Sequence, residues 1–129
     1  MDSQKQRRIV IAGTKDTRAL LVFKFEHANF AVSEVSTAKD VLFHLLDPSP
    51  ADAAVIGDFD DRLENTLSLV TDLRCIFDAD EMPIVVLSAH AFPHNRTDAL
   101  AAGANEFIPM PFTHLDVVVK AVKQLLEAA

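Results

Sequence analysis

The stretch AVIGDFDD, residues 54–61, places a short apolar run directly before a glycine and three carboxylates. A β-branched run without polar alternation is typical of a strand that is covered on both faces. Similar runs recur along the chain, and a segment with helical spacing of apolar residues follows each one. The expected strands are residues 8–12, 30–35, 53–57, 84–87 and 106–109. This alternation predicts an α/β fold of flavodoxin-like type, a (βα)5 doubly wound, five-stranded parallel sheet.

The segments between the expected strands carry apolar residues at helical spacing, which identifies the side of each helix that should face the sheet. These inner faces are predicted to be Leu21, Phe25 and Ala28; Val41, Leu42, Leu45 and Leu46; Leu67, Val70, Leu73 and Phe77; Ala99, Leu100 and Ala102; and Leu115, Val118, Val119, Val122, Leu125 and Leu126. The expected N-caps are Ser36 or Thr37, Asn95 and Thr113, and Gly103 is expected to end the fourth helix.

Composition limits the kind of protein this is. At 129 residues, half of them apolar, residues 1–129 are expected to form one domain. Cys75 is the only cysteine, which rules out an intrachain disulfide and favours a reducing, cytoplasmic location. No apolar run approaches the roughly 20 residues that span a bilayer, so we expect no membrane insertion. A net charge of −7 argues against direct binding of nucleic acid.

A site is expected where the strands end. In open α/β sheets, ligands bind beyond the carboxyl ends of the strands. Here those ends carry Gly13 and Thr14, then Asp58, then Ser88, and finally the turn at residues 109–111.

Three segments together resemble the receiver domain of bacterial two-component response regulators: AVIGDFDD (54–61), PIVVLSA (83–89) and GANEFIPMPF (103–112). The resemblance covers almost the whole chain. It implies a phosphoacceptor at Asp58, a phosphate-contacting hydroxyl at Ser88 and a switch aromatic at Phe107. Residues 52–57 also mimic the pattern that leads to the phosphoacceptor, which would place Gly57 there. The spacing from Asp58 to Ser88 favours Asp58.

Two parts of the family's site differ in this sequence. Gly13 and Thr14 stand where the family has an acidic pair, and no Asp or Glu occurs in residues 3–15. Met110 stands where the family has the lysine that precedes Pro111. Phosphoryl transfer depends on neutralising the charge on the phosphoryl oxygens with a metal ion and a cation. These differences therefore predict impaired phosphorylation.

Mg²⁺ is the cofactor that the resemblance implies. Its sites generally use one or two carboxylates together with water. Asp58 could supply one, and Asp60, Asp61 or Asp16 would have to supply the second. We therefore expect no firmly bound cofactor and regard these carboxylates as weak candidates.

Zinc is not expected either. His90 and His94 have the spacing of helical metal pairs, but Pro93 lies between them and argues for a loop.

The favoured interpretation is an atypical receiver, not an enzyme, that acts in bacterial signalling by binding proteins. Its partner would be a signalling kinase, a phosphotransferase or an effector, bound in this family chiefly through the fourth helix, fifth strand and fifth helix. Val117 and Ala121 lie off the inner face of the last helix, which could form a homodimer or partner surface. Residues 91–93 add an apolar tip after Ser88.

Two alternatives stay open. The first is a conventional receiver that takes phosphate at Asp58 from a histidine kinase. The second is a flavodoxin-like domain whose altered site binds a small anion or metabolite. A plainer account of the same residues makes Asp58 a strand-end carboxylate bonded to loop amides, Ser88 a hydroxyl bonded to the backbone, and Phe107 a core aromatic.

Overall fold

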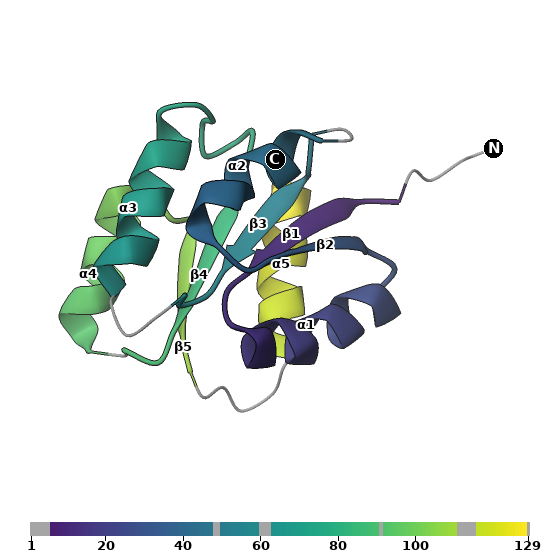
Figure 1. Ribbon diagram of the computed structural model, residues 1–129, viewed down its shortest axis with the longest axis horizontal. Helices are drawn as coiled ribbons and strands as arrows, with labels where there is room; N and C mark the ends of the chain where they lie inside the picture. Colours follow the sequence, from purple (N-terminus) through teal and green to yellow (C-terminus); the bar gives the residue numbers. More distant parts are fainter. Residues whose placement is uncertain (1–5, 48–49, 60–62, 91, 111–115, 129) are drawn as a thin grey trace.

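The computed structural model describes residues 6–47, 50–59, 63–90, 92–110 and 116–128. Five parallel strands lie in the order β2-β1-β3-β4-β5 (Figure 1). The strands are β1 (Arg8–Ala12), β2 (Ala31–Val35), β3 (Ala53–Ile56), β4 (Ile84–Ser88) and β5 (Glu106–Pro109). The helices are α1 (Lys15–His27), α2 (Val41–Leu46), α3 (Leu63–Arg74), α4 (Pro93–Ala102) and α5 (Asp116–Ala128), with a 3-10 turn, η1 (Ala38–Asp40), before α2. The predicted doubly wound (βα)5 sheet is confirmed.

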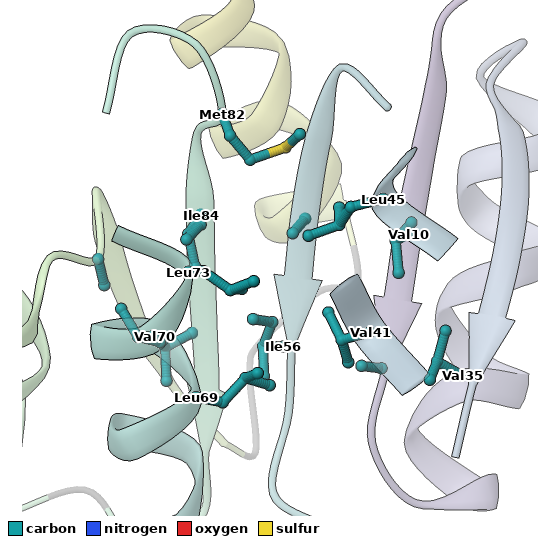
Figure 2. Packing of buried hydrophobic residues seen from close by; sticks show 14 of the residues in the cluster. Val10, Val35, Val41, Leu45, Ile56, Leu69, Val70, Leu73, Met82 and Ile84 are labelled. Carbon is teal, nitrogen blue, oxygen red and sulfur yellow. The ribbon is translucent and has the colours of Figure 1, made fainter. Parts of the chain in front are cut away.

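Helices cover both faces of the sheet: α1 and α5 lie on one side, and α2, α3 and α4 on the other (Figure 1). Alternate residues of a strand point to opposite faces. In β1, Ile9 and Ile11 join the core under α1 and α5, whereas Val10 and Ala12 join the core under α2, α3 and α4. Figure 2 shows the second core, where side chains of α2 and α3 pack onto the strands. The central strands are therefore buried on both sides.

The strand predictions were accurate to within one residue. The bounds of β1 and β5 are as expected, β2 begins at Ala31 and β3 ends at Ile56. The fourth strand continues through Ser88 because its ladder with β5 pairs Ser88 with Pro109.

The predicted start of α4 was wrong. The helix begins at Pro93, with Phe92 at the N-cap position, and Asn95 lies buried in the first turn. Proline suits the first helical position because its fixed φ is helical and the N–H it lacks has no partner there. The expectation that Pro93 keeps its surroundings in a loop was therefore also wrong. Gly103 ends α4 as predicted, with a φ of 121°.

Several inner-face predictions also need correction. In α3 the buried residues include Leu69 instead of the expected Leu67, which is only partly buried, and Phe77 lies beyond the helix. Leu46 and Leu100 were expected inside but are 48% and 38% exposed. Helical spacing locates a stripe only to within about one residue, and these side chains lie at its edge.

Two of the expected N-caps, Thr37 and Thr113, precede the second and fifth helices. Thr37 occupies the N-cap position of η1, and its hydroxyl donates to the Asp40 carboxylate at 2.7 Å. The expected N-cap Thr113 and the inner-face residue Leu115 lie outside the described residues. Among the described residues, no helix is both long enough and apolar enough to cross a bilayer.

Candidate functional site

Asp58 and Ser88 meet where β3 and β4 end. The ladder pairs Ile56 with Val86, so two residues further along each strand the backbone brings Asp58 opposite Ser88. Asp58 is 9% exposed and Ser88 is fully buried. Ser88 Oγ lies 3.1 Å from each carboxylate oxygen of Asp58. The structure thus brings together the two site residues that the sequence placed on neighbouring strands.

The Asp58 carboxylate is held by donors from the β4–α4 loop. The Ala89 N–H donates to Oδ2 at 3.2 Å. Ser88 Oγ accepts from the His90 N–H at 3.0 Å. Because a hydroxyl has one proton, Ser88 directs it to the carboxylate while its lone pair serves His90. Both carboxylate oxygens of Asp58 therefore have hydrogen-bond donors within the chain.

Two side chains that the sequence analysis did not assign to the site contact the backbone beside Asp58 and Ser88. Asn95 Nδ2 donates to the His90 carbonyl at 2.9 Å, and Thr66 Oγ1, fully buried, lies 3.4 Å from the Gly57 carbonyl. Both are polar residues in the first turns of helices that follow the site. Their place in the first turn of a helix is the sequence feature that could have identified them, because helices in this fold start at the edge of the sheet where the strands end.

The end of β1 approaches Asp58 through its backbone. The Thr14 N–H donates to the Asp58 carbonyl at 3.2 Å. Gly13 has a φ of 142°, which favours glycine, and a Cβ there would lie 3.4 Å from Gly57 Cα. The Thr14 hydroxyl is exposed and accepts from the Thr17 N–H at the start of α1, at 3.5 Å. Gly13 and Thr14 bring no charge to the Asp58 carboxylate.

Met110 joins the end of β5 to this edge. Its N–H donates to the Ser88 carbonyl at 2.8 Å. Its side chain is partly buried and packs against the core under α1 and α5. A thioether carries no charge and donates no hydrogen bond, so this position supplies no cation. Pro111, the last residue of the expected turn, lies outside the described residues.

Phe107 is 3% exposed and belongs to the core under α2, α3 and α4. Arg96 of α4 donates to the Phe107 carbonyl at 3.2 Å, which ties α4 to β5. The side chain thus occupies a core position, and its role as a switch aromatic stays a prediction.

Of the carboxylates considered as Mg²⁺ ligands, Asp58 and Asp16 belong to the described residues. Asp16 is exposed in the first turn of α1. The other two candidates, Asp60 and Asp61, lie outside the described residues. Within the described ranges, no group of three or more His, Cys, Asp or Glu side chains could hold a metal ion, and this includes His90 and His94. Gly13 and Thr14, the described residues where the family has its acidic pair, supply no second carboxylate for a Mg²⁺ site beside Asp58.

An exposed aromatic side chain and a groove lie near the carboxyl ends of the strands. Phe92, at the apolar tip after Ser88, is 65% exposed and stacks on His94 with ring centroids 5.9 Å apart. Ala91 lies outside the described residues. A groove of about 570 Å³ lies between η1 and α3, with Lys39, Phe59 and Asp72 among its lining residues.

Comparison with known proteins shows what the chain is similar to. No family model matches the sequence. The chain is 30% identical over 120 residues to the transcriptional regulatory protein PrrA of Mycobacterium leprae, across 93% of the chain and 49% of that protein. The chain therefore spans about half the length of this curated relative.

Several solved structures with the same fold are receiver domains or response regulators. The receiver domain of the Francisella response regulator 1452 has a TM-score of 0.81 at 23% identity, over 95% of this chain and 98% of that one. A response regulator of Thermotoga maritima gives 0.80 at 22%, over 95% and 99%. An orphan response regulator of H. pylori gives 0.76 at 17%, over 93% and 96%.

The fold is thus that of receiver domains. The sequence similarity to a transcriptional regulatory protein, together with the fold shared with solved receiver domains, supports a receiver domain of a two-component response regulator.

Proposed function

We propose that this receiver domain is impaired in Mg²⁺-dependent phosphorylation of Asp58 and acts in signalling by binding other proteins. One observation carries the proposal. The hydrogen bonds from Ser88 and Ala89 satisfy the Asp58 carboxylate within the chain, while the neighbouring strand ends present Gly13, Thr14 and Met110 in place of charged groups.

Phosphoryl transfer requires a metal ion and a cation near the phosphoryl oxygens, and the uncharged residues Gly13, Thr14 and Met110 supply neither a carboxylate ligand for the metal nor a cation. A metal ion beside Asp58 would need a second carboxylate, and Gly13 and Thr14 cannot provide one. An aspartyl phosphate would also need a cation at position 110. Each hydrogen bond to a charged group that is lost in this way costs about 1.5–3 kcal/mol. Both the reaction and its product are thus disfavoured.

The surface formed by α4, β5 and α5 is the proposed partner site. Arg96 and Glu106 form an ion pair at 3.4 Å on this surface, with side chains 54% and 39% exposed. Val117 is 41% exposed. Ala121 was expected to share this exposed surface but packs against the core under α1 and α5, so Val117 is the better apolar contact. A signalling kinase, a phosphotransferase, an effector or a second copy of the chain would bind here, in the cytoplasm and without catalysis by this domain.

A conventional receiver, phosphorylated at Asp58 by a histidine kinase, is the second candidate. The position of the Ser88 hydroxyl, 3.1 Å from both carboxylate oxygens, favours it, because that hydroxyl could also contact a phosphoryl group. The third candidate, a small-ligand domain, would use the groove between η1 and α3.

Incubation with Mg²⁺ and acetyl phosphate, followed by intact mass measurement, separates the first two candidates. We expect no phosphoryl adduct on the native chain. A stoichiometric adduct that disappears in Asp58→Asn would support the conventional receiver instead. A second receiver that does accept phosphate from acetyl phosphate, treated in parallel, verifies that the donor is active.

A further inference from the structure

Positively charged side chains follow the junction between α1 and α5. Two adjoining hollows lie there, of about 310 and 290 Å³, and both are lined by Ala28 and Lys123. Together they form what we call the α1–α5 groove. Its charged lining consists of Arg7, Lys24, Lys120 and Lys123, with the carboxylates Asp116 and Glu127 and the imidazole of His27. Arg96, Glu106 and Val117 of the proposed partner site do not line it.

This local charge is opposite in sign to that of the whole chain. The chain has 12 Lys and Arg against 19 Asp and Glu, and four of those cations line the α1–α5 groove beside two carboxylates. Lys24 pairs with Asp116 at 3.1 Å, which links the two helices. Lys120 and Lys123 are exposed and form no ion pair with a carboxylate of the described residues. Clustered cations of this kind attract anions from solution.

Large apolar side chains flank the cations on α1. Phe23 is 67% exposed and Leu20 is 56% exposed. The Phe23 ring stacks on His27 with centroids 5.8 Å apart and an interplanar angle of 18°. Leu20 and Lys24 are also separated by four residues, so they lie on the same side of the helix. An apolar surface therefore borders the cationic groove.

We propose that the α1–α5 groove binds an acidic segment of another protein that carries a large apolar side chain. Carboxylates of the segment would pair with Lys120 and Lys123, while its apolar side chain would cover Phe23 and Leu20. A long polyanion fits less well, because its charge continues past the groove and meets a molecule whose net charge is −7. A short acidic segment avoids that repulsion.

The test uses a short fluorescein-labelled peptide of glutamates with a central Phe-Leu pair, titrated with the protein by fluorescence anisotropy at about 0.15 M salt, where charges more than about 8 Å apart are largely screened. We expect saturable binding that weakens about tenfold in Lys120→Glu/Lys123→Glu, because like charges then oppose each other. The control Lys15→Glu/Lys39→Glu changes the net charge equally at exposed positions outside the groove, and should bind within about twofold of the native chain. Circular dichroism checks that each variant is folded.

Two further measurements make the result specific. Phe23→Ser should weaken the Phe-Leu peptide and leave an all-glutamate peptide unchanged. The proposal is overturned by no binding to the native chain, by equal losses in the two charge variants, or by tighter binding of a single-stranded oligonucleotide through the same lysines. Because Asp58 and Val117 are unchanged in all these variants, a negative result leaves the function proposed above standing.

Discussion

Ser88 Oγ lies 3.1 Å from both carboxylate oxygens of Asp58, and it accepts a hydrogen bond from the His90 N–H at 3.0 Å. This one hydroxyl connects the end of β3 to the loop after β4. The Ser88 hydroxyl therefore already bonds the Asp58 carboxylate, and it would have to form new hydrogen bonds to contact a phosphoryl group on Asp58.

Ser88→Ala should lower the free energy of unfolding by about 1.5–3 kcal/mol, because a nearly buried carboxylate loses a donor and the His90 N–H loses its acceptor. Urea denaturation measures the change. Ser68→Ala is the matched control: it removes an exposed hydroxyl on α3 and should change stability by less than about 0.5 kcal/mol. Equal effects at both positions would mean that the Ser88 hydrogen bonds contribute nothing.

Gly103→Ala should destabilise the chain by about 1–3 kcal/mol. The φ of Gly103 is 121°, and an added Cβ would clash with Arg74 Cγ. Thermal unfolding measures the loss, with Ala101→Gly as a control that alters α4 without a left-handed backbone. A variant as stable as the native chain would show that the turn after α4 can rearrange without cost.

Arg74 joins α3 to the loops at the opposite edge of the sheet from the site. Its guanidinium donates to the carbonyls of Gly103 and Met82 and to Asn105 Oδ1, at 2.8, 2.9 and 2.7 Å. Burial lowers the pKa of Arg74, and the nearby Asp78 carboxylate opposes that effect.

Arg74→Met should cost about 1–3 kcal/mol, because partly buried carbonyls lose charged donors. Arg96→Met removes one exposed ion pair and a single hydrogen bond to a backbone carbonyl, that of Phe107, and should therefore cost less than Arg74→Met. Chemical denaturation of the two variants compares them directly. The reverse ranking would contradict the role given to Arg74.

Most of the fold could be predicted because the positions of the strands and their alternation with helices depend on strong patterns, such as the buried runs of β3 and β4. The start of α4 could not, because Asn95 and Pro93 both carry helix-start signals and only the backbone shows that Pro93 takes the first position. The sequence placed Asp58 and Ser88 at strand ends, and the register between β3 and β4 brings the two side chains together. The donors from Ala89 and His90 are backbone groups, and residue types do not reveal them.

The most direct test of the central claim compares phosphorylation of the native chain with that of Thr14→Asp/Met110→Lys, using Mg²⁺ and acetyl phosphate and measuring intact mass. Thr14 is exposed, so an aspartate fits there and can still cap α1, whereas Gly13 has a φ that disfavours any other residue. We predict no adduct on the native chain and an Asp58-dependent adduct on the variant. A native chain that is fully modified at Asp58 would contradict the account.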